Sequence, residues 1–134
     1  MDNLVLDTNI LVSALWSLNG NSAKIVELVL YGEANIYFTH SICEEYKSVL
    51  NRPKFNFRQE YKQPLLNGLF ECGNLINVEP SKIILPDESD RKFYDTAKAT
   101  NSLLITGNQK HFPKENTIIS PAEYLSRLHG KSYI

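Results

Sequence analysis

Short, continuous apolar runs alternate along this chain with longer segments whose apolar positions recur every three or four residues. The short runs predict strands at residues 4–6, 35–38, 75–78, 103–105 and 117–119, and the longer segments predict helices at 10–16, 23–31, 41–50, 57–72, 89–101 and 122–128. A continuous apolar run is typical of a strand that is covered on both faces. The alternation therefore predicts an α/β fold with a parallel sheet and helices on both of its faces.

Turn-forming and capping residues set the expected ends of several elements. Gly32 and Gly73 are expected to end the helices that precede them. Ser41 is expected to begin a helix, with Glu44 as its capping-box partner three residues later. The segment 80–88, rich in proline and acidic residues, is expected to form a loop.

Length and composition exclude several classes of protein. The 134 residues are expected to form a single domain over 1–134, with 131–134 as a frayed tail. A hydrophobic content of 43% and a net charge of −1 exclude a disordered chain, and no apolar run reaches the roughly 18 residues of a membrane span. The acidic N-terminus is unlike a signal peptide, and Cys43 and Cys72 match no disulfide or metal pattern, which favours a cytoplasmic protein.

Three acids from different elements are expected to point toward one region. Asp7 follows the first strand, at the end of the sheet where α/β proteins bind ligands. A helical projection places Glu45 at the edge of an inward stripe, with Glu44 nearly opposite. On the helix after Pro86 it places Asp90 within the inward stripe and Asp95 well away from it. Taken singly, Asp7 and Asp90 could each be an ordinary helix N-cap.

Carboxylates that are packed together repel one another unless a cation lies between them. A donor set made only of oxygen suits Mg²⁺ or Mn²⁺, and such ions take substrate phosphates as further ligands. The chemistry that this set favours is metal-assisted attack of water on a phosphodiester. Because the net charge is near zero, binding of nucleic acid through charge alone is not expected.

The segments that carry these acids resemble the PIN-domain nuclease family, in its bacterial branch of toxins from toxin–antitoxin pairs. They occur in the family's order and read LVLDTNIL at 4–11, SICEEY at 41–46, VLNRPKF at 49–55, PDESDRKFY at 86–94 and LITGNQKHFP at 104–113. The resemblance implies a three-layer α/β/α sandwich with a mostly parallel, roughly five-stranded sheet. It also implies a Mg²⁺- or Mn²⁺-dependent ribonuclease that cleaves single-stranded RNA and is silenced by a small antitoxin protein.

The resemblance also assigns roles to individual residues. Carried over by position, Asp7, Glu45 and Asp90 are the acids expected to ligate metal and to support catalysis. Asp87 is expected to be an auxiliary acid. Many PIN nucleases have an aspartate where this chain has Asn108, which can still offer a carbonyl ligand but brings no negative charge.

Polar and basic residues near these segments have two possible roles each. Three of them are expected to hold the acids and metal-bound waters, or equally to serve ordinary strand-to-helix turns: Thr8, Asn9 and Thr106. Basic residues interleaved with Phe55 and Phe57 could contact RNA while the rings stack on bases, or could form a polar connection with both rings in the core: Arg52, Lys54 and Arg58. Lys110 is expected beside the scissile phosphate in preference to His111.

Two other functions stay open at this stage. The first is a non-catalytic PIN-like module that binds RNA or protein, which Asn108 would favour. The second is an acid-cluster phosphotransfer domain, although a dehalogenase-like phosphatase would have an aspartate at the position of Asn9. The apolar stripe of residues 24–31 is expected to join the core, although this region often contributes to homodimers in PIN domains.

Overall fold

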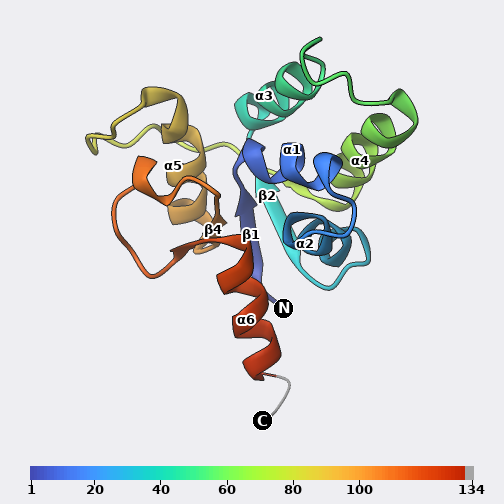
Figure 1. Cartoon of the computed structure of the whole chain (residues 1–134). Helices are drawn as coiled ribbons and strands as arrows, with labels where there is room; N and C mark the ends of the chain where they lie inside the picture. Colours follow the sequence, from blue (N-terminus) through green and yellow to red (C-terminus); the bar gives the residue numbers. More distant parts are fainter. Residues whose placement is uncertain (132–134) are drawn as a thin grey trace.

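The strands form one parallel sheet with β1 at its centre (Figure 1). The structure is a computed structural model that describes residues 1–131. Its strands are β1 (Asn3–Leu6), β2 (Asn35–Phe38), β3 (Asn74–Leu75), β4 (Leu103–Ile105) and β5 (Ile118–Ile119). They lie in the order β3-β2-β1-β4-β5, and every neighbouring pair is parallel. The predicted α/β fold with a parallel sheet is confirmed.

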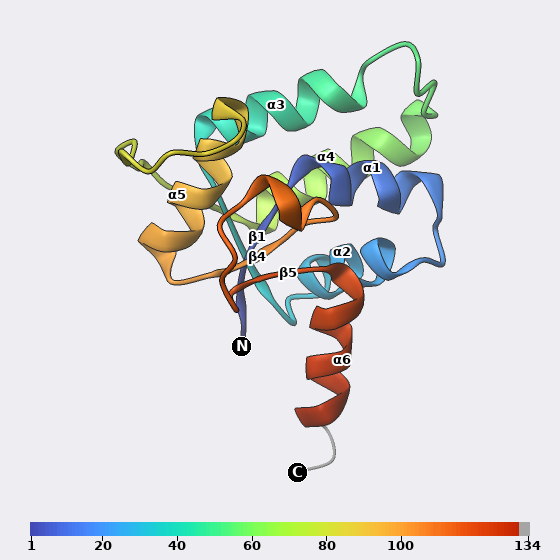
Figure 2. The same cartoon turned by 60° about the vertical axis from the view of Figure 1, so that its left-hand side comes forward.

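Helices cover both faces of this sheet (Figure 2). They are α1 (Thr8–Trp16), α2 (Asn21–Leu30), α3 (His40–Leu50), α4 (Gln59–Cys72), α5 (Arg91–Thr100) and α6 (Pro121–Lys131). One face is covered by α5, which packs against β1, β2 and β4, whereas α1, α2 and α4 lie on the other face and α6 packs against α2. This arrangement confirms the predicted three-layer sandwich. Within residues 1–131 we find no helix with the length and apolar character needed to cross a lipid bilayer.

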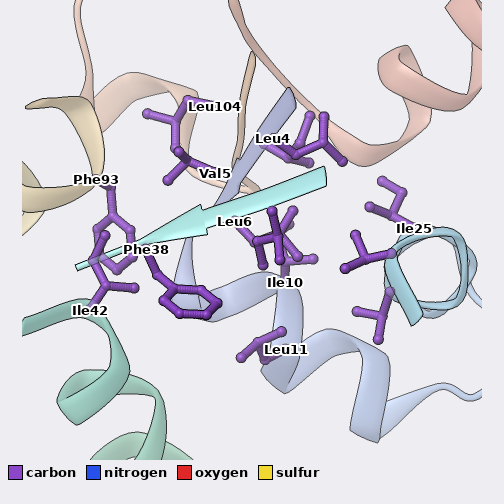
Figure 3. Close-up of a cluster of buried hydrophobic side chains, with 14 of the residues drawn as sticks. Leu4, Val5, Leu6, Ile10, Leu11, Ile25, Phe38, Ile42, Phe93 and Leu104 are labelled. Carbon is purple, nitrogen blue, oxygen red and sulfur yellow. The ribbon is translucent and has the colours of Figure 1, made fainter. Parts of the chain in front are cut away.

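The core is built on both sides of β1. Leu4, Val5 and Leu6 have no exposed surface. Figure 3 shows Leu4 and Leu6 on the side of Ile25 from α2, and Val5 on the opposite side, toward Phe93 from α5. Full burial of one such side chain contributes about 1.5–3 kcal/mol. The two-sided burial explains why this strand is continuously apolar.

Two glycines end helices where the sequence predicts it. Gly32 has a φ of +77°, which favours glycine, and the N–H of Glu33 donates to the carbonyl of Leu28 at 2.8 Å. This backbone closure is typical of a Schellman motif at the end of α2. Gly73 is the C-cap of α4, and its N–H donates to the carbonyl of Leu69 at 2.9 Å.

The capping box predicted at Ser41 and Glu44 is wrong. Thr39 caps α3 instead, because its extended backbone at the end of β2 lets Oγ1 accept the N–H of Ile42 at 3.2 Å. Glu44 is exposed and lies 3.5 Å from the Nζ atom of Lys47. The helix therefore begins one residue earlier than predicted.

The strand predicted at 75–78 is also largely wrong. β3 consists of Asn74 and Leu75 only, and both residues are exposed at the edge of the sheet. The strand is short because its partner strand, β2, ends at Phe38, whose carbonyl accepts the N–H of Ile76 at 2.9 Å. The frayed tail predicted for 131–134 falls on 132–134, outside the described residues, and on Lys131, which ends α6.

The helix α2 buries most of the apolar stripe predicted for residues 24–31. Ile25, Val26 and Val29 are buried in the core, whereas Tyr31 beyond the end of the helix is exposed. The prediction that this stripe joins the core is confirmed.

Gly73→Ala is expected to lower the free energy of unfolding by about 1–3 kcal/mol. A β-carbon at residue 73 would lie 2.3 Å from the ring of Phe38 and 2.7 Å from the carbonyl oxygen of Leu69, so the backbone would have to shift. Urea denaturation, monitored by circular dichroism, measures the change in the free energy of unfolding. Gly130→Ala is the control, because the described residues leave open space around it and alanine favours a helix by roughly 0.5–1 kcal/mol. Equal stabilities of the two variants would contradict this packing.

Candidate active site

The candidate site lies where β1 and β4 end side by side at the centre of the sheet. The chain leaves β1 to form β2 on one side, whereas β4 lies on the other side of β1. Open α/β sheets bind ligands at such a switch in strand order, beyond the carboxyl ends of the strands. The N–H of Asp7 donates to the carbonyl of Ile105 at 3.0 Å, which extends the pairing of β1 with β4 by one residue. Asp7 is therefore fixed at this point.

The carboxylate of Asp7 is buried and held by polar side chains. The hydroxyl of Thr106, at the end of β4, donates to Oδ2 at 2.7 Å, and the amide of Asn9 donates to the same oxygen at 3.2 Å. An ordinary N-cap role for Asp7 does not account for these two contacts. Burial raises the pKa of the Asp7 carboxyl, the hydrogen bond from Thr106 partly opposes this rise, and the charge of Glu45 adds to it.

Glu45 reaches the site because α3 is tied to the end of β1. The neighbouring Tyr46 is fully buried, and its hydroxyl donates to the carbonyl of Leu6 at 2.5 Å. Glu45 is half-buried and accepts a hydrogen bond from the hydroxyl of Thr8, the first residue of α1. The Nζ atom of Lys92, from α5, lies 2.7 Å from Oε1 of Glu45. Glu45 thus faces the site while Glu44 is exposed, as the helical projection predicts.

Asp90 approaches the site from the segment before α5. It ends a short 3₁₀ helix (Glu88–Asp90), and its buried Oδ2 atom has no hydrogen-bond partner among the described residues. Nδ1 of His111 lies 3.3 Å from this oxygen. Burial raises the pKa of Asp90, and the charges of Asp7, Asp87 and Glu45 raise it further against the opposing effect of His111.

Local capping in this segment is done by Asp87 rather than by Asp90. Asp87 is exposed, and its Oδ1 atom accepts the N–H and the hydroxyl of Ser89, each at 2.9 Å. These hydrogen bonds hold the pKa of Asp87 below its usual range. Asp90 stands at the N-cap position of α5, but its side chain accepts no capping hydrogen bond there, so the alternative that Asp90 serves as an ordinary N-cap is wrong.

The three predicted acids fit a divalent cation in their chemistry. The charges of Asp7 and Glu45 both raise the pKa of Asp90, and that of Glu45 raises the pKa of Asp7, so the carboxylates repel one another. Within residues 1–131, no three His, Cys, Asp or Glu side chains are gathered closely enough to form a ready metal cluster. The buried Oδ2 atom of Asp90, which accepts no hydrogen bond from the described residues, and the all-oxygen donor set nevertheless suit Mg²⁺ or Mn²⁺.

The residues after β4 do not lie as expected, since Lys110 was predicted beside the scissile phosphate in preference to His111. The N–H of Asn108 donates to the hydroxyl of Thr106 at 2.9 Å, while the side chain of Asn108 is exposed. The 3₁₀ helix Gln109–His111 then brings His111 beside Asp90. Lys110 and His111 are both exposed, but the structure shows a contact with one of the three acids, Asp90, for His111.

The basic residues of the α3–α4 connection lie beside two partly buried aromatic rings, Phe55 and Phe57, and Phe57 packs against the core. Arg52, Lys54 and Arg58 are exposed. Phe55 and Phe57 stack at 5.2 Å between ring centroids, and both pack edge-on against Trp16, at 6.2 and 5.4 Å. Trp16 is 63% exposed at the end of α1. We call Trp16, Phe55 and Phe57 the aromatic cluster.

Lys92 and Trp16 were not predicted to be functional residues. A lysine on a helix is ordinarily a solvated residue, and no periodic pattern indicates that the stem of Lys92 reaches across to α3. Trp16 continues the apolar periodicity of α1, which is typical of a core residue rather than an exposed one. However, a carboxylate on an inward face, such as Glu45, needs a partner. Lys92, two positions after Asp90, is a basic residue that could supply it.

Asp90→Asn is expected to raise the melting temperature of the metal-free protein by a few degrees at pH 7–8. Because the pKa of Asp90 is raised in the folded state, its ionised form destabilises the fold above that pKa. The gain should shrink as the pH falls through the folded pKa toward the unfolded one, since wild-type Asp90 is then protonated. Differential scanning calorimetry between pH 4 and pH 8 measures this trend. Glu44→Gln, at an exposed acid of α3, should show no such gain, and a pH-independent effect of Asp90→Asn would contradict the assignment.

Comparisons with known proteins identify the family. Residues 3–110 match the PIN domain family. The chain is 28% identical over 109 residues to the uncharacterized protein MJ1680 of Methanocaldococcus jannaschii, which covers 79% of this chain and 70% of that protein. The fold of this chain is similar to the crystal structure of VapBC2 from Rickettsia felis bound to a DNA fragment from their promoter, with a TM-score of 0.58. The two sequences are 20% identical, and the match covers 88% of this chain and 96% of that chain. Since the family match spans most of the chain and includes all three acids, this protein belongs to the PIN domain family.

Proposed function

We propose that this PIN domain is an endoribonuclease that uses Mg²⁺ or Mn²⁺ to hydrolyse phosphodiester bonds of single-stranded RNA. The observation that carries the proposal is the convergence of Asp7, Glu45 and Asp90, from three separate elements, at the switch point of the sheet. PIN domains are generally nucleases, which supports this chemistry over a phosphotransfer domain.

Asp7, Glu45 and Asp90 would hold the divalent ion, with Asp87 and Asn108 as auxiliary groups. When bound, such an ion supplies Lewis-acid polarisation of the phosphodiester and a more acidic water for in-line attack. Each ligand carboxylate must keep one orientation for this chemistry, and hydrogen bonds from neighbouring groups provide that constraint.

The chain itself orients two of these carboxylates. The hydrogen bonds from Thr106 and Asn9 both end on Oδ2 of Asp7, so rotation of this carboxylate is restricted. The hydroxyl of Thr8 does the same for Glu45. We therefore assign Thr8, Asn9 and Thr106 to holding the acids, in addition to forming the strand-to-helix turns that the sequence allows.

We further propose that RNA extends from the acids along α1 to the aromatic cluster. Trp16 lies eight residues after Thr8 on α1, which corresponds to roughly 12 Å along the helix axis. Exposed aromatic rings beside basic side chains are typical of surfaces that stack the bases of single strands. The Nζ atom of Lys54 lies 5.2 Å from the ring centroid of Phe55. Three exposed basic residues of this connection would contact phosphates: Arg52, Lys54 and Arg58. Lys110 would contact the RNA strand on the side of the site formed by β4.

A toxin role in the cytoplasm is the biological setting that we propose. The structural likeness to VapBC2, a toxin–antitoxin assembly, supports a small antitoxin as a partner. An arginine of that partner could pair with the repelling acids and so silence the site. A homodimer is a further proposal, which the family resemblance supports.

Asp7→Asn and Glu45→Gln are each expected to lower metal-dependent RNA cleavage by roughly a hundredfold or more. Both changes remove a negative ligand while keeping the size of the side chain. Cleavage of a panel of single-stranded RNAs with Mg²⁺ or Mn²⁺ measures the loss. Glu44→Gln is the matched control for Glu45→Gln, because Glu44 is exposed on the same helix, and it should cleave like the wild type.

Equal cleavage by the wild type and by Asp7→Asn would contradict the nuclease proposal. If the wild type bound these RNAs without cleaving them in either metal, the alternative of a non-catalytic PIN-like binding module would be supported. The exposed Asn108, in place of the family's fourth acid, is the observation that favours this alternative.

Trp16→Ala is expected to weaken binding of single-stranded RNA, by an amount equivalent to about 1–3 kcal/mol if one base stacks on the ring. Fluorescence anisotropy with a labelled RNA in Ca²⁺ measures the affinity. Tyr31→Ala is the control, since Tyr31 is also an exposed aromatic residue but lies after α2. Equal affinities of the two variants would place the RNA elsewhere.

A further inference from the structure

Lys92 occupies a position between the acids and a neighbouring cavity. Its Nζ atom lies 2.7 Å from Oε1 of Glu45 and donates to the carbonyl of Ser89 at 2.6 Å. The side chain of Lys92 is only 20% exposed. Lys98, on the same helix, is 50% exposed and pairs with Glu115 away from the site. The burial and the partner of Lys92 therefore distinguish it from an ordinary surface lysine.

The contact with Glu45 joins two elements through a long, supported side chain. Lys92 lies on α5 and Glu45 on α3, and these helices contact each other. The ammonium group of Lys92 lies 5.2 Å from the ring centroid of Phe93, which favours a cation at this place. The ion pair thus has a defined geometry, unlike most exposed pairs.

Both carboxylate oxygens of Glu45 already have partners. Oε2 accepts the hydroxyl of Thr8, and Oε1 faces the ammonium group of Lys92. A divalent ion and an ammonium group carry the same sign of charge, so they repel each other at one carboxylate. Glu45 can therefore bind a divalent ion more strongly once Lys92 gives up its contact.

The displaced ammonium group has room next to the site. Lys92 lines a cavity of about 820 Å³ whose other wall is formed by the start of α3, at Thr39, His40 and Ser41. A phosphodiester is the anion that a nuclease brings to its acids, and a lysine binds phosphate as a point charge. The phosphate that Lys92 contacts would lie where this cavity borders Glu45.

We propose that Lys92 is a positioning residue that holds Glu45 before the metal binds and then exchanges Glu45 for a phosphate of the RNA. This inference rests on the proposed nuclease function. It predicts two opposite effects of one substitution, because removal of the ammonium group frees a metal ligand but deletes a contact with the substrate.

Mn²⁺ binding to the full chain, measured by isothermal titration calorimetry without RNA, tests the first effect. Lys92→Met keeps an apolar stem of similar length and should bind Mn²⁺ about three- to tenfold more tightly than the wild type. Lys98→Met should bind like the wild type, and Lys92→Arg, which keeps the charge, should remain close to it. In a Glu45→Gln background, Lys92→Met should no longer change the Mn²⁺ affinity, since the competition has lost its target.

Cleavage at saturating Mn²⁺ tests the second effect. Lys92→Met should raise the KM for single-stranded RNA about tenfold or more, with Lys92→Arg restoring most of the loss. If the wild type binds Mn²⁺ and cleaves RNA but Lys92→Met binds Mn²⁺ equally or more weakly, this inference alone would be overturned. A wild type that neither binds Mn²⁺ nor cleaves RNA would overturn the proposed function and this inference together.

Discussion

The structure depends on the burial of β1 on both of its faces. Leu4, Val5 and Leu6 have no exposed surface, so helices must pack on each side of the strand and a neighbouring strand must pair with each edge. The residue after such a strand cannot be fully solvated. Asp7 is therefore buried because of the strand that precedes it, and the polar groups around Asp7 follow from the cost of burying a carboxylate.

The electrostatics of the site work against the stability of the metal-free fold. Asp7 and Asp90 both have raised pKa values because of burial and of mutual repulsion with Glu45. Two basic side chains next to the outer acids reduce this repulsion: Lys92 lies beside Glu45, and His111 lies beside Asp90. Asp7, in the middle, is held by neutral donors only in the contacts described above. Destabilising charges of this kind are common where function rather than stability decides the residue.

Periodicity and strand ends allowed much of the fold and the three acids to be predicted. The apolar runs predicted the strands because burial decides both, and the projection separated Glu45 from Glu44 because one helix face is covered. The projection was wrong for Asp95, which is buried because the segment before α5 folds over it and the N–H of Ser81 donates to its carboxylate at 2.8 Å. β3 was predicted too long, since an edge strand is limited by pairing rather than by apolar sequence. Lys92 and Trp16 were missed because their contacts join distant segments through long side chains, which leave no local pattern.

The hydrogen bond from Thr106 to Asp7 joins residues that are 99 positions apart in the chain. Contacts of such long range form late, since the intervening chain must first be ordered. During synthesis on the ribosome, Asp7 is made before Thr106 and lacks this hydrogen-bond donor until β4 has been made. Most of the segment between Asp7 and Thr106 must therefore leave the ribosome before the polar groups around Asp7 are complete.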